Sequence, residues 1–138
     1  MIHNTYFSSK ERLKGTFLIK INDIFIVCLH LDDTSKIERK KQIESLPIKD
    51  KMIIGGDFNE DFLKESKLYT FIENLGFTTT INKKYTYILD KCLIDNIFVK
   101  ELKIKKSKIL NNCKINVYCQ VKRYGSDHFP IIMEVEIS

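Results

Sequence analysis

Short apolar segments rich in β-branched and aromatic residues alternate with turn residues along most of the chain. Residues 16–21 and 24–29 are two such segments, separated only by Asn22-Asp23, which predicts a two-residue β-hairpin. Residues 24–29 are apolar at every position, which is typical of a central strand covered on both faces. Cys28 lies within this segment, so we expect it to be a buried small hydrophobe.

Two stretches have the capping signals and the periodicity of helices. Ser35 and Glu38 have capping-box spacing and predict a helix that runs to about Leu46, just before Pro47. A second helix is predicted from Lys64 to the glycine at position 76. Its shared apolar face consists of Leu68, Phe71, Ile72 and Leu75.

The remaining apolar segments predict further strands at residues 51–55, 85–88, 93–100, 115–121 and 130–137. Residues 100–108 are strongly basic and do not favour one conformation. Strands interleaved with two helices predict an α/β fold with a mixed sheet.

Composition narrows the class of protein. A length of 138 residues with 43% hydrophobic and 30% charged residues predicts one globular domain. The sequence contains neither an apolar run of about 20 residues nor a signal-peptide pattern, and its four cysteines are irregularly spaced without a Cys-x-x-Cys motif. These features predict an intracellular protein without a membrane span or zinc site, and the net charge of +5 suits an anionic partner such as nucleic acid.

Acidic and amide side chains follow the strand predicted at residues 51–55. Gly55 and Gly56 allow a sharp turn there, and Asp57 and Asn59 come next. The Asp can orient or deprotonate a water molecule and the Asn can donate to an oxyanion, but an Asx-turn fits these residues equally well. An EF-hand loop is excluded, because its sixth and twelfth positions would be Phe62 and Leu68.

Three further polar positions stand beside apolar segments. His30 ends the segment 24–29, and Asp127 and His128 precede the last predicted strand. A structural histidine and a polar turn are the simpler interpretations of these positions. Asp95 lies inside an otherwise apolar segment, and a buried carboxylate there needs a partner, for which a histidine is well suited.

Four strings in this order resemble the second half of the endonuclease/exonuclease/phosphatase superfamily. They are His30-Leu31, Gly56-Asp57-Phe58-Asn59, Ile94-Asp95-Asn96-Ile97-Phe98 and Ser126-Asp127-His128-Phe129-Pro130, with Tyr85-Thr86-Tyr87 before the third. His30-Leu31 followed by Glu38-Arg39 and Gln42 resembles the tyrosyl-DNA phosphodiesterase type. The resemblance implies part of a four-layer α/β/β/α sandwich, mainly one mixed β-sheet with helices on its outer face.

The same resemblance implies a role for each of these polar residues in phosphodiester hydrolysis by in-line attack of water. His128 would contact the scissile phosphate with Asp95 as its hydrogen-bond partner, and His30 would be a second imidazole at the phosphate. Asp57 would align the water and Asn59 would bind a phosphate oxygen. Asp127 and Asp57 would lie at a Mg²⁺ or Mn²⁺ ion.

The sequence departs from the superfamily in its N-terminal part. The strand-end Asn and the Gln-Glu pair with the principal metal ligand are not found before His30, and Glu11 lacks the context of such a ligand. We therefore expect residues 1–138 to be a truncated domain of this type, with a weakly bound metal and impaired or no activity alone. The missing N-terminal half could be a separate chain, and without it the inner face of the sheet would expose apolar residues.

Two other functions fit parts of the sequence. A non-catalytic module that binds nucleic acid or phosphate could use a basic set made of Lys100, Lys103, Lys105, Lys106, Lys108, Lys122 and Arg123. A two-metal phosphoesterase could use His30, Asp57 and His128. The substrate stays open among DNA, RNA, a protein–DNA adduct, an inositol phosphate and a lipid headgroup.

Overall fold

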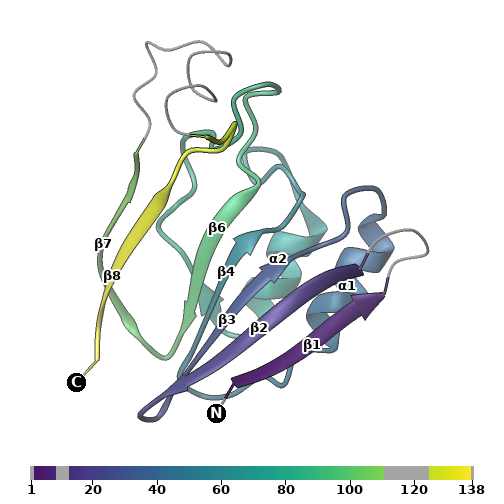
Figure 1. Ribbon diagram of the computed structural model, residues 1–138. Coiled ribbons are helices and arrows are strands. Elements are labelled where there is room, and N and C mark those ends of the chain that lie inside the picture. The colour runs from purple at the N-terminus through teal and green to yellow at the C-terminus, as the bar shows by residue number, and fades with distance from the viewer. Residues whose placement is uncertain (1, 9–12, 111–124, 138) are drawn as a thin grey trace.

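The computed structural model describes residues 2–8, 13–110 and 125–137, with side chains from residue 16 onward, and contains two helices and two sheets in those ranges (Figure 1). The larger sheet has six strands in the order β1-β2-β3-β4-β6-β5. Their bounds are β1 Ile2–Ser8, β2 Leu13–Ile21, β3 Ile24–His30, β4 Met52–Asp57, β5 Phe77–Thr78 and β6 Asp95–Lys100. The smaller sheet pairs β7 Lys103–Ile109 with β8 Ile131–Glu136.

The larger sheet is mixed, because β3 and β4 are parallel and its other neighbours are antiparallel. Both helices, α1 Lys36–Glu44 and α2 Lys67–Asn74, lie on one face of it (Figure 1). The predicted fold class, one mixed sheet with helices on its outer face, is therefore confirmed. Neither of the described helices is long and apolar enough to cross a membrane.

The local signals in the sequence act as predicted at most turns and caps. Asn22 has a φ of 54° between the paired strands β2 and β3, so the hairpin is confirmed. The Oγ of Ser35 accepts a hydrogen bond from the Glu38 amide at 3.2 Å at the start of α1. The second helix begins at Lys67 instead of Lys64, because the hydroxyl of Ser66 accepts from the amide of Tyr69 and caps it.

The core lies between the large sheet and the helices. Residues opposite one another on β2, β3, β4 and β6 point to the helices, and these are Leu18, Val27, Ile54 and Phe98. They pack in one buried cluster with Ile43 of α1 and Ile72 of α2. Burial of this apolar surface is the main source of the stability of the fold.

The opposite face of the sheet is only partly covered. Cys28 is exposed there, contrary to the prediction that it is buried and that β3 is covered on both faces. The reason is that side chains alternate along a strand, and the helices cover only the face that carries Val27 and Leu29. Several half-buried or exposed apolar residues lie together on this face, as the strand register shows. We use the term open face for this set, which consists of Phe17, Ile19, Ile26, Cys28 and Ile53.

Other strand predictions change in detail. Residues 85–88 form a turn segment with isolated bridges from Tyr87 to Cys92 and His128, not the predicted strand. The backbone of this turn forms hydrogen bonds with Cys92, Asp127 and Phe129 instead of the regular hydrogen bonds that join two neighbouring strands. The segment predicted at 93–100 becomes a strand only from Asp95, the basic stretch 100–108 contributes most of β7, and β4 and β8 match their predictions closely. The strand predicted at 115–121 lies outside the described residues.

Candidate active site

Three of the predicted site residues lie in one row across the large sheet. His30 is paired in register with Asp57 on β4, and Asp57 is paired with Asp95 on β6. Residues paired in this way point to the same face of a sheet. The row therefore borders the open face, two positions beyond Cys28 on β3.

Gly56 allows β3 and β4 to approach closely just before this row. Its φ is 140°, and a Cβ atom added to it would lie 2.0 Å from the carbonyl oxygen of Leu29. Only glycine fits such a backbone without displacing the neighbouring strand. Gly56 thus positions Asp57 beside His30, and the sharp turn predicted at Gly55 and Gly56 is wrong, because β4 continues through both glycines to Asp57.

The carboxylate of Asp57 has two different neighbours. Its Oδ1 accepts a hydrogen bond from the backbone amide of Asn59 at 2.8 Å, so the Asx-turn that was one of the two interpretations of this sequence is present. Its Oδ2 lies 3.6 Å from Nε2 of His30. Burial raises the pKa of Asp57, and the nearby charge of Asp95 adds to this effect, so the carboxylate favours a proton or a cation.

Asn59 holds the ends of β3 and β4 together. Its Nδ2 donates to the carbonyl oxygen of Leu31 at 2.8 Å, and the amide of Leu31 donates to the carbonyl oxygen of Asp57 at 2.9 Å. Asn59 itself has a φ of 51°, in the left-handed region that Asn tolerates better than most residues. One of its amide hydrogens is therefore used within the protein.

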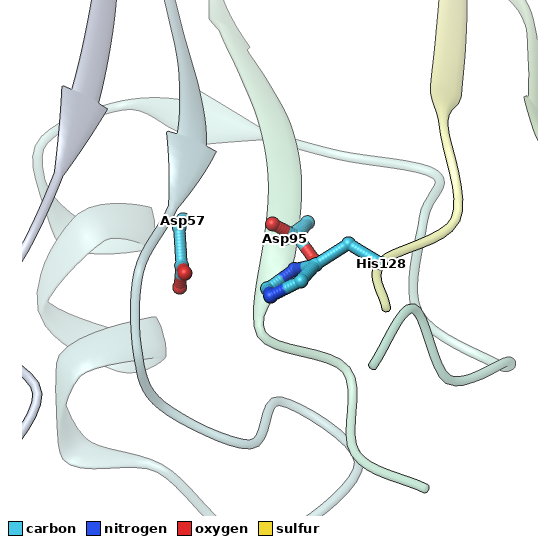
Figure 2. A group of neighbouring side chains, drawn as sticks. All are labelled: Asp57, Asp95 and His128. Atoms are coloured by element: carbon cyan, nitrogen blue, oxygen red, sulfur yellow. The ribbon is translucent and has the colours of Figure 1, made fainter. Parts of the chain in front are cut away.

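His128 reaches the row from the loop that precedes β8 (Figure 2). Its Nδ1 lies 2.7 Å from Oδ2 of Asp95, and its Nε2 lies 3.7 Å from Oδ1 of Asp127. The hydrogen bond to Asp95 raises the pKa of His128 although partial burial opposes this. Because Nδ1 faces Asp95, the histidine can present Nε2 to a ligand.

The structure thus brings most of the predicted site together at one rim of the sheet. One ligand atom from each of Asp57, Asp95 and His128 lies within 4.8 Å of the others (Figure 2). His30 stands next to Asp57 but its side chain is 51% exposed, and Asp127 is 39% exposed beside His128. Asn59, which the resemblance also places in the site, donates from its side-chain amide to the carbonyl oxygen of Leu31.

Sequence analysis did not identify Glu60 as part of this region. Glu60 is buried, lies 3.4 Å from Nη2 of Arg39 and accepts a hydrogen bond from the hydroxyl of Ser66. Nη1 of Arg39 donates to the carbonyl oxygen of Asp32. The pair therefore links the loops that follow β3 and β4. The sequence signal for Glu60 was its position next to Asp61 between Phe58 and Phe62.

The donor set of Asp57, Asp95 and His128 is chemically suited to a divalent cation. Mg²⁺ is commonly held in proteins by one or two carboxylates, and Mn²⁺ also accepts imidazole. A cation would offset the repulsion between Asp57 and Asp95 and the desolvation that raises the pKa of Asp57.

No protein-family model and no curated protein matches the sequence, but many solved structures share its fold. A functionally unknown conserved protein from Enterococcus faecalis V583 aligns with a TM-score of 0.72 at 18% identity, over 99% of this chain and 65% of that one. An endonuclease/exonuclease/phosphatase family protein from Leptotrichia buccalis C-1013-b aligns with a TM-score of 0.64 at 23% identity, over 99% and 61%. The fold is that of the endonuclease/exonuclease/phosphatase superfamily.

A third similar structure carries a ligand. The inositol polyphosphate 5-phosphatase domain of spsynaptojanin, in complex with inositol (1,4)-bisphosphate and calcium ion, aligns with a TM-score of 0.62 at 16% identity. The alignment covers 96% of this chain and 53% of that domain. The chain therefore spans less than two thirds of the length of each of these three structures.

Proposed function

We propose that this chain forms part of the active site of a metal-dependent phosphoric ester hydrolase. The observation that carries the proposal is the convergence of Asp57, Asp95 and His128, from β4, β6 and the loop before β8, on one rim of a phosphoesterase-type sheet. Structures with this fold include a phosphatase domain with a bound inositol phosphate, which supports a phosphate ester as the substrate class.

The protein side chains would divide the chemistry between water activation and charge stabilisation. Asp57 would orient the attacking water and accept its proton, since its carboxylate faces the same rim as Asp95 and His128. His128, held through Nδ1 by Asp95, would donate from Nε2 to a phosphate oxygen and stabilise the charge that develops in the transition state. His30 would be a second donor beside Asp57.

A Mg²⁺ or Mn²⁺ ion would be held by Asp57 and Asp95, with Asp127 at or beside it. When bound, the ion would supply positive charge at the phosphate oxygens. Asn59 is proposed to contribute its second amide hydrogen to a phosphate oxygen, since the first is bonded to Leu31.

We further propose that the active hydrolase needs a second layer of polypeptide packed on the open face. Phe17, Ile19, Ile26 and Ile53 form an apolar surface there that continues to the row of site residues. Apolar surfaces of this kind are sites of protein contact. The layer would supply the metal-ligating Glu and the Asn that the sequence lacks, so the 138-residue chain alone would hydrolyse substrate slowly or not at all.

Binding gives a positive readout even when hydrolysis is slow. We would titrate the chain with Mn²⁺ and then with inorganic phosphate by isothermal titration calorimetry, and assay bis(4-nitrophenyl) phosphate in parallel. We expect Mn²⁺ to bind, phosphate to bind more tightly in its presence, and EDTA to abolish this enhancement. Asp57→Asn should weaken the Mn²⁺ affinity and His128→Gln the phosphate affinity, each by about tenfold or more.

Asp50→Asn is the matched control, because it removes one exposed carboxylate outside the site and should leave both affinities unchanged. Binding that is equally strong in Asp57→Asn and His128→Gln would contradict the proposed site. Rapid hydrolysis by the chain alone, lost in His128→Gln, would contradict the need for a second layer.

The alternative of a non-catalytic nucleic-acid-binding module is supported by β7, whose four lysines are all exposed. Two of them are partly neutralised, since Lys103 lies 3.2 Å from Glu136 and Lys106 lies 3.0 Å from Glu134. If this surface binds DNA or RNA, affinity should fall steeply with added salt and Lys105→Gln should weaken it. The intracellular location stays a prediction.

A further inference from the structure

Thr86 contacts the chain on both sides of the Asp95–His128 pair. Its side chain is fully buried, and its Oγ1 accepts hydrogen bonds from the backbone amides of Ile94 and Asp95 at 3.3 and 3.1 Å. Its carbonyl oxygen accepts from the amide of Phe129 at 2.7 Å. One residue thus anchors both the start of β6 and the residue that follows His128.

The side chain of His128 is held from the same segment. Tyr87 forms an isolated bridge with His128, and the two ring centroids are 5.0 Å apart. Ile88 adds a backbone hydrogen bond to the carbonyl oxygen of Asp127. Segment 86–88 therefore sets where the imidazole enters the site.

The hydroxyl of Thr86 has a specific task in this arrangement. Asp95 is the first residue of β6, and both its amide and the amide of Ile94 before it have Thr86 Oγ1 as their acceptor. A residue without this acceptor would leave two amide donors in a buried region unsatisfied, and the backbone of Asp95 would shift toward water. A shift of a few tenths of an ångström is enough to lengthen a 2.7 Å contact between side chains.

We propose that Thr86 is a positioning residue that sets the hydrogen bond between Asp95 and His128. Its importance for catalysis rests on the function proposed above, because that function assigns the phosphate to His128. The hydrogen bond itself exists in the protein without substrate, so it can be measured whether or not the chain hydrolyses a phosphate ester.

The test is the nuclear magnetic resonance signal of the Nδ1 proton of His128, which a short hydrogen bond to a carboxylate moves far downfield. Thr86→Val removes the acceptor at nearly unchanged volume. We expect the downfield signal to disappear or move strongly upfield, and hydrogen exchange at the amides of Ile94 and Asp95 to accelerate by about tenfold. His128→Gln assigns the signal, because the signal must be absent from that variant.

Thr86→Ser retains the hydroxyl and should keep the signal and slow exchange, whereas Thr70→Val is a matched change at an exposed threonine and should alter neither. If Thr86→Val does not fold, the comparison of Thr86→Ser with Thr86→Ala isolates the hydroxyl, since both lack the methyl group. If neither valine nor alanine is tolerated, loss of the signal in a folded Thr86→Ser protein overturns the proposal and its retention supports it.

An unchanged signal and unchanged exchange in Thr86→Val would overturn the positioning role. A different outcome would separate the two proposals. If the chain binds neither Mn²⁺ nor phosphate, but the downfield signal of His128 is lost or shifted in Thr86→Val as expected, the proposed function is overturned and the positioning role stands.

Discussion

Oδ2 of Asp95 lies 2.7 Å from Nδ1 of His128, although the two residues are 33 positions apart in the sequence. Both side chains are largely removed from solvent, with 16% and 29% of their surface exposed. A charged carboxylate in this position favours the protonated imidazole, and this is why the pKa of His128 is raised.

This contact predicts how the free energy of unfolding depends on pH. A histidine whose pKa is raised in the folded state stabilises the protein fully below the pKa of the unfolded state, about 6.5, and this stabilisation is lost as pH rises through the higher folded value. We therefore expect the unfolding free energy, measured by urea titration, to fall as pH is raised above about 6.5.

His128→Gln and Asp95→Asn should both flatten this dependence, since the first removes the titrating imidazole and the second removes the carboxylate charge that raises its pKa. The raised pKa of Asp57 acts at lower pH, where its ionisation destabilises the fold, so it does not generate the slope above pH 6. A slope in His128→Gln equal to that of the unmodified protein would contradict the assignment.

Gly56 predicts a large difference between two neighbouring alanine substitutions. Gly56→Ala places a methyl group 2.0 Å from the carbonyl oxygen of Leu29 at a φ of 140°, and should lower the unfolding free energy by at least about 2 kcal/mol. Gly55→Ala meets its nearest atoms, in Asn96 and Ile97, at 3.4 Å and should change it by less than about 1 kcal/mol. Chemical denaturation of both variants measures this difference, and equal losses would argue against the close approach of β3 and β4.

The buried pair of Arg39 and Glu60 predicts strong destabilisation when one partner is removed. Arg39→Met leaves the carboxylate of Glu60 buried without its cation and should cost about 3 to 5 kcal/mol of unfolding free energy. Lys40→Met is the control, because Lys40 contacts only Glu44 and the ring of Phe71 at the surface among the interactions described, and its loss should cost at most about 1 kcal/mol. Arg39→Met combined with Glu60→Met should recover part of the loss, and a double variant less stable than Arg39→Met alone would contradict this explanation.

The open face predicts that two cysteines differ in reactivity. Cys28 is exposed on this face, whereas partial burial raises the pKa of Cys92 to about 11 and keeps its thiol protonated at neutral pH. Iodoacetamide should therefore alkylate Cys28 much faster than Cys92, as measured by mass spectrometry of the digested protein.

The same reaction tests the proposed second layer. A polypeptide that packs on the open face should protect Cys28 and leave the slow alkylation of Cys92 unchanged. Alkylation of Cys28 in the isolated chain as slow as that of a buried thiol would show that the open face is covered in solution.

The periodicity and the turn residues of the sequence were sufficient for much of the fold. The hairpin at Asn22 and the helix cap at Ser35 follow from local backbone chemistry, which depends on a few neighbouring residues. The resemblance of four strings to the superfamily added the candidate site, and the fold agrees with that resemblance.

Local patterns failed where the outcome depended on distant parts of the chain. Nothing within residues 24–29 indicates which side of β3 the helices cover, so the exposure of Cys28 could be known only from the packed sheet. Residues 85–88 have the composition of a strand, but Thr86 uses its hydrogen bonds to join the start of β6 to the His128 loop.

The sequence by itself determined which side chains are available for chemistry and the turns and caps at which many elements begin or end, because these depend on residue type and near neighbours. Only the tertiary structure decided that His30, Asp57, Asp95 and His128 meet at one rim, that Glu60 pairs with Arg39, and that one face of the sheet is open. The physical reason is that strand order and register join residues far apart in the chain, and no local propensity encodes such pairings.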